Sequence, residues 1–122
     1  MGFLINLVFR TEEVMIHQKL IDEIIKRLVQ VYNPLEIYLF ESEHWTEDEE
    51  PDDIDLKIIV ESFPEGTAPM ERGIAGTEAL CGLAEEVFML VFTKNEFDEM
   101  RLIKDLTFLH TQKYGLKIYA KQ

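Results

Sequence analysis

Two aspartates two residues apart, Asp53 and Asp55, are the residues of this chain best suited to chemistry. They open an apolar run that ends at Val60, which predicts a β-strand. Side chains at positions i and i+2 of a strand point to the same face, so we expect the two carboxylates side by side, with Ile54 and Leu56 turned into the core. Magnesium is often held by one or two carboxylates together with substrate phosphates. The pair therefore predicts a magnesium site that activates an attacking oxygen.

The pair closes an acidic segment, in which nine of the fifteen residues 41–55 are Asp or Glu and none is Lys or Arg. The chain has 24 acidic and 12 basic residues, a net charge of −12; without these nine, 15 acids face 12 bases, or −3. We expect neither nucleic acid nor an anionic membrane as a partner, because both need clustered Lys and Arg. The segment either holds a metal ion or is a solvated loop that a basic partner binds.

The chain of 122 residues has the length of one domain, and its hydrophobic share of 47% argues against disorder. Residues 1–14 begin with an apolar run that is too short to span a bilayer and lacks a basic leader. We interpret them as an N-terminal apolar extension, with translation starting at Met1 or Met15, and expect one domain over residues 15–122. The single cysteine, Cys81, indicates a reducing, cytoplasmic compartment, and we expect it to be buried.

The elements that position the aspartates follow from hydrophobic periodicity. Apolar residues recur at three- and four-residue steps through residues 14–32, which predicts an amphipathic helix that ends at Asn33-Pro34. A capping box, Thr93 with Glu96, predicts another helix that runs to about Tyr114. Further elements are expected as strands 36–40, 54–60, 87–92 and 116–120 and a helix over 70–86. This order predicts an α/β or α+β domain with helices on a small mixed sheet.

A wider pattern resembles the minimal nucleotidyltransferase family. That family has an apolar strand ending Leu-Phe-Gly-Ser, a short charged loop, and Asp-x-Asp-Leu at the start of the next strand. Here residues 39–42 read Leu-Phe-Glu-Ser and residues 53–56 read Asp-Ile-Asp-Leu, at the same spacing. Residues 32–38, 92–97 and 113–119 are also similar to the family, so that the resemblance covers roughly Met15 to Ala120.

The resemblance implies the nucleotidyltransferase fold and the metal-dependent transfer of a nucleoside monophosphate, of the AMP type. The donor would be a nucleoside triphosphate such as ATP, and the acceptor a hydroxyl of a protein or of another molecule. It implies that Asp53 and Asp55 are catalytic and bind Mg²⁺, and that Ser42 contacts the triphosphate. Some relatives are antitoxins that modify a helical toxin, which implies a toxin-like protein as a partner. A homodimer stays open.

Three features depart from the family pattern. Glu41 replaces a Gly that lets the backbone approach a phosphate, and the loop after Ser42 has no Arg to pair with phosphate oxygens. Phe88 stands where the third strand of the family carries a further carboxylate, and Glu86 is the nearest substitute for a base that deprotonates the acceptor. Two hypotheses stay open. The protein is a nucleotidyltransferase with retained or lost activity, or a non-catalytic module whose acidic loop binds a basic partner.

Overall fold

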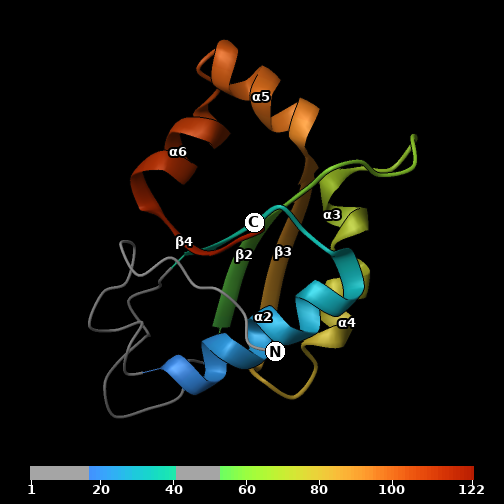
Figure 1. Cartoon of the computed structure of the whole chain (residues 1–122), viewed down its shortest axis with the longest axis vertical. Helices are drawn as coiled ribbons and strands as arrows, with labels where there is room; N and C mark the ends of the chain where they lie inside the picture. Colours follow the sequence, from blue (N-terminus) through green and yellow to red (C-terminus); the bar gives the residue numbers. More distant parts are fainter. Residues whose placement is uncertain (1–16, 41–52) are drawn as a thin grey trace.

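The computed structural model describes residues 17–40 and 53–122. The predictions for residues 1–14, and those for Glu41 and Ser42 in the acidic segment, lie outside the described residues. In Figure 1 the helices fall into two groups, with α2, α3 and α4 on one side of the sheet strands and α5 and α6 at the top. The described elements, in chain order, are α2 (Gln18–Tyr32), β1 (Glu36–Phe40), β2 (Asp53–Val60), α3 (Pro69–Arg72), α4 (Ile74–Ala79), β3 (Glu86–Thr93), α5 (Lys94–Leu102), α6 (Leu106–Tyr114) and β4 (Gly115–Ala120).

The four described strands form one mixed sheet in the order β3-β2-β1-β4. Strand β1 is antiparallel to β2 and to β4, whereas β2 and β3 are parallel. A parallel pair needs a crossover connection, and α3 and α4 supply it. The predicted α/β class, with a small mixed sheet flanked by helices, is confirmed. The apolar strand β2 lies inside the sheet, and β3 and β4 form its edges.

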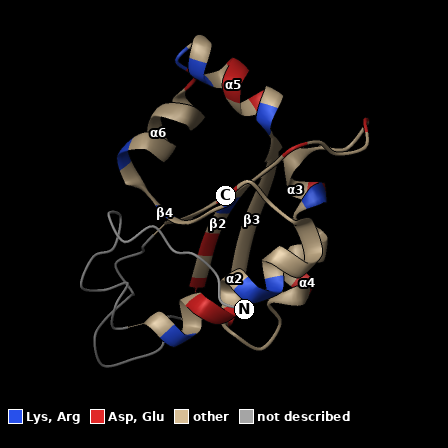
Figure 2. Ribbon diagram, in the orientation of Figure 1, with Lys and Arg blue, Asp and Glu red and all other residues tan. Residues whose placement is uncertain are grey.

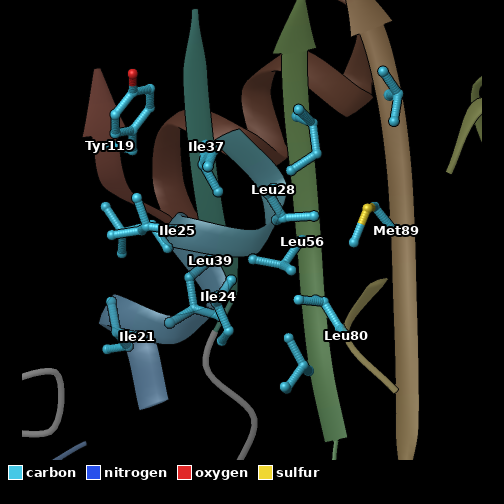
Figure 3. Close-up of a cluster of buried hydrophobic side chains, with 14 of the residues drawn as sticks. Ile21, Ile24, Ile25, Leu28, Ile37, Leu39, Leu56, Leu80, Met89 and Tyr119 are labelled. Atoms are coloured by element: carbon cyan, nitrogen blue, oxygen red, sulfur yellow. The ribbon is translucent and has the colours of Figure 1, made fainter. Parts of the chain in front are cut away.

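The larger core lies between α2 and one face of the sheet. In Figure 3 the buried side chains of α2 lie over Leu39 of β1 and Leu56 of β2. Each fully buried Leu or Ile contributes about 1.5–3 kcal/mol relative to an exposed one. The predicted amphipathic helix is confirmed, and its four fully buried residues, at helical spacing, are Ile21, Ile24, Ile25 and Leu28.

A second, aromatic core covers part of the opposite face. Phe97 of α5 and Phe108 of α6 pack there in a tilted arrangement, with ring centroids 5.3 Å apart. On the sheet they meet Ile59 and Phe92, which lie near the ends of β2 and β3. Helices α5 and α6 therefore cover the end of β2 on this face, and Asp53 and Asp55 at its start belong to neither described core.

The single helix predicted over residues 70–86 is two short helices, α3 and α4, and β3 already begins at Glu86. Gly73 lies between the two helices and Gly76 inside α4, and both lie against other elements. A side chain at Gly73 would collide with the carbonyl of Met89, and one at Gly76 would meet the ring of Tyr32. The N–H of Gly76 donates to the Tyr32 hydroxyl at 2.8 Å. The two glycines thus allow close packing on β3 and α2. Gly82, with φ of 91°, is outside the right-handed helical region, so the helix cannot continue to residue 86.

The helix predicted from Thr93 to about Tyr114 is interrupted after Leu102. Lys104 takes a left-handed backbone conformation, with φ of 53°, and Asp105 caps α6 by accepting from the N–H of Thr107 at 2.8 Å. The expectation that Cys81 is buried is wrong, since it lies exposed beyond the end of α4. No helix among the described residues is long and apolar enough to cross a membrane.

Candidate functional site

Asp53 and Asp55 lie together at the start of β2, on the face opposite the α2 core. The two side chains are partly exposed, whereas Ile54 and Leu56 between and after them are buried at 1% and 0% exposure. This alternation confirms that both carboxylates share one face of the strand. Figure 2 shows acidic residues at the start of β2.

The register with β3 identifies the neighbours of the two aspartates. Asp53 pairs with Glu86, and Asp55 pairs with Phe88. Residues paired across parallel strands project to the same side of the sheet. Three carboxylate residues and one exposed phenylalanine therefore occupy the beginning of this face. Phe88 lies directly beside Asp55, so the site has an aromatic ring where a further carboxylate would adjoin that aspartate.

An open cleft of about 530 Å³ adjoins these residues. Its volume lies in the range of small-molecule sites, well above that of a single ion. Its wall contains carboxylates and no Lys or Arg among the described residues, so that it favours a cation or a ligand that brings one. The polar and aromatic lining residues are Asp53, Asp55, Thr77, Glu85, Glu86 and Phe88.

The environment of Asp55 disfavours its negative charge. Burial raises the pKa of the Asp55 carboxyl, while the positive charges of Lys57 and His110 act in the opposite direction, and the nearby Asp53 raises the pKa further. A divalent cation beside the two aspartates would stabilise both ionised carboxylates. The shared face of the two carboxylates and the negative charge of the cleft therefore both favour a divalent cation.

Lys57 is a site residue that the sequence reasoning missed. It lies on the same face as Asp55, two residues along β2, and is only 9% exposed. Its Nζ donates to the hydroxyl of Thr111 at 3.1 Å and lies 4.8 Å from the centroid of the Phe40 ring. Burial lowers the pKa of Lys57, and the charge of Asp55 opposes this. The signal was available, because Lys57 is the one charged residue in the run 56–60 and has strand spacing from Asp55.

Helix α6 brings a histidine to the site. His110 stacks on the Phe40 ring, with a centroid separation of 5.3 Å, and contacts the ring of Tyr114 at 5.0 Å. Phe40 pairs with Asp55 across the antiparallel strands β1 and β2. Lys57 and His110 therefore lie on the side of Asp55 that α6 covers. Asp53 and Glu86 lie on the other side of Asp55, along the cleft.

Whether Asp53 and Asp55 suit a magnesium ion depends on the other ligands of that ion. Within residues 17–40 and 53–122, no three His, Cys, Asp or Glu side chains are grouped closely enough to hold a metal ion by themselves. Magnesium commonly takes only one or two protein carboxylates and completes its shell with water and phosphate oxygens. Asp53 and Asp55 therefore fit an ion that arrives with a phosphorylated ligand. The proposed contact of Ser42 lies outside the described residues.

Comparison of the chain with models of known protein families, with curated proteins and with solved structures finds no match. The nucleotidyltransferase assignment thus depends on the motif residues of this sequence and on the arrangement of their side chains.

Proposed function

We propose that this protein is nucleotidyltransferase-like, binds a magnesium–nucleoside triphosphate such as Mg²⁺–ATP in the cleft, and transfers the nucleoside monophosphate to a hydroxyl. The observation that carries the proposal is that Asp53, Asp55 and Glu86 share one face at the start of the parallel strands β2 and β3, beside one cleft. The resemblance of residues 39–42 and 53–56 to the nucleotidyltransferase motif supports it. The single cysteine favours the cytoplasm as its location.

Each residue has a role in this proposal. Asp53 and Asp55 would hold Mg²⁺, which when bound would offset the charge of the triphosphate and of the departing pyrophosphate. Ser42 would contact the triphosphate, as the family resemblance implies. Glu86, paired with Asp53, accepts the proton of the acceptor hydroxyl as its oxygen bonds to the α-phosphorus and pyrophosphate leaves. Lys57 and His110 support the ionised state of Asp55 from the covered side.

Calorimetric titration of Mg²⁺–ATP and Mg²⁺–GTP tests the proposal. We expect saturable binding that disappears without Mg²⁺ and weakens at least about tenfold in Asp53→Asn/Asp55→Asn, which keeps side-chain size but removes both charges. With a hydroxyl acceptor and α-labelled nucleotide, Glu86→Gln should lower transfer and leave nucleotide binding intact. Equal binding, or no binding, by the unmutated protein and the Asn variant would sink the proposal for these nucleotides.

Phe88 favours a second candidate, a non-catalytic interaction module. It is 47% exposed beside Asp55, where it offers an apolar contact instead of a carboxylate. In this reading the acidic loop binds a basic protein, such as a toxin-like partner, and electrostatic attraction accelerates the association. The variant Asp53→Asn distinguishes the two candidates. It should abolish nucleotide transfer by an enzyme but leave the partner binding of an interaction module intact.

A further inference from the structure

An apolar groove of about 270 Å³ runs along the outer side of β3, next to α3 and α4. Three large apolar side chains line it and are exposed to an unusual degree: Met70 at 58%, Ile74 at 57% and Phe88 at 47%. Side chains of these types are usually buried. Exposed apolar side chains grouped in this way are typical of surfaces that bind another molecule.

The groove lies at a sheet edge that the protein covers only in part. In the described sheet β3 pairs with β2 alone. Arg72 covers the far part of this edge, since its Nη1 donates to the carbonyl of Val91 at 3.1 Å. The residues of β3 that line the groove are Val87, Phe88 and Met89, which lie nearer the start of the strand. A bound segment is therefore confined to the first half of β3.

The charge around the groove selects its occupant. Glu78 lines the groove, and Glu85 and Glu86 line the adjoining cleft, which shares the wall residues Thr77, Val87 and Phe88. None of these three glutamates has an ion pair within the described part of the chain. Neither wall includes a described Lys or Arg. A second copy of this chain, with its net charge of −12, is poorly matched to such a surface.

We propose that this groove docks a segment of a second protein in which large apolar side chains alternate with Lys or Arg. The apolar side chains lie among Met70, Ile74 and Phe88, and the cationic groups reach Glu78, Glu85 and Glu86. Such an interface combines an apolar centre with a charged rim. It goes beyond the proposed nucleotide chemistry, because it needs neither metal nor nucleotide.

Fluorescence anisotropy with synthetic peptides, in which two residue types alternate as along a strand, tests the docking. One peptide combines Leu with Lys, the second Leu with Glu, and the third Ser with Lys, so that the apolar and charged contributions are separated. We expect the Leu/Lys peptide to bind at least about tenfold more tightly than either other peptide, with an affinity that falls as salt increases. Equal binding of the Ser/Lys peptide would overturn the proposal.

Paired variants locate the binding. Met70→Ser/Ile74→Ser should weaken the binding of the Leu/Lys peptide at least about tenfold. Glu85→Gln/Glu86→Gln should also weaken it and reduce its salt dependence. Leu102→Ser/Ile103→Ser is the matched control, since those side chains are 77% and 74% exposed at the C-terminal end of α5. Equal weakening by the control would overturn the proposal, as would self-association that the groove variant abolishes.

The groove and the nucleotide site are separable. Met70→Ser/Ile74→Ser changes two side chains that line the groove but not the cleft, so the heat of Mg²⁺–ATP binding should persist in this variant while peptide binding weakens. If the protein does not bind Mg²⁺–ATP, the peptide titrations still test whether the groove binds a second protein.

Discussion

On one face of the sheet, Asp55 has acidic, basic and aromatic neighbours. Along β2 it lies between Asp53 and Lys57, and on β3 it adjoins Phe88. The spacing of the two aspartates predicted their common face, because alternation along a strand is a local property. The hydrogen bond that holds Lys57 to Thr111 spans 54 residues, so no local pattern could reveal it. No local pattern could reveal that Phe88 of β3 adjoins Asp55 either, because this pairing depends on the register of the two strands.

Replacing Phe88 by aspartate tests this register at the residue scale. Because Phe88 is half-exposed, Phe88→Asp removes little buried packing and places a third carboxylate beside Asp55. We expect the affinity for Mg²⁺, measured by calorimetry, to rise about tenfold. Phe88→Asn has the same size without the charge and serves as control. Equal affinities of the Asp and Asn variants would contradict a cation site beside these residues.

Arg72 and Glu96 join three elements, α3, β3 and α5. Arg72 is 7% exposed, and its Nη1 lies 2.6 Å from Oε1 of Glu96 and donates to Val91 of β3. Glu96 also accepts from the N–H of Thr93 at 2.8 Å, within the predicted capping box. The box was predictable because its residues are three apart. The partner Arg72 is 24 residues away, and its role emerges only when α3 packs on β3.

The ion pair makes stability depend on pH at the element scale. The hydrogen bond from Arg72 holds the pKa of Glu96 below its ordinary value of 4.5. Its contribution is therefore complete above that value and is lost as the pH falls through the folded-state pKa. Because Glu96 is partly exposed, we expect Glu96→Gln to lower the free energy of unfolding by about 1–2 kcal/mol near neutral pH.

Urea unfolding of the unmutated protein and of Glu96→Gln, at neutral and acidic pH, checks this expectation. The difference between the two proteins should disappear in acid, where the glutamate is protonated. A difference that persists unchanged would show that the substitution acts through packing. Lys94 offers a control, since its ion pair with Asp98 is long at 3.5 Å and exposed, and Lys94→Gln should change the unfolding free energy by less than about 0.5 kcal/mol.

The whole molecule covers the two faces of its sheet unequally. Helix α2 packs on one face, whereas α5 and α6 lie over only part of the other (Figure 1). An open cleft adjoins the start of β2. The order of strands and helices predicted the α/β class. It could not predict the splitting of the helix over residues 70–86, because Gly73 and Gly76 are explained by contacts with β3 and α2 that form only in the folded chain.

Mapping a paramagnetic ion over the whole molecule tests the central claim most directly. Mn²⁺ replaces Mg²⁺ at oxygen sites and broadens the NMR signals of nearby backbone amides. With a small amount of Mn²⁺ and excess ATP, we predict broadening centred on Asp53, Asp55 and their β3 neighbours Glu86 and Phe88, and its loss in Asp53→Asn/Asp55→Asn. Broadening confined to residues 41–52, or equal broadening in the Asn variant, would contradict a metal–nucleotide site at the start of β2.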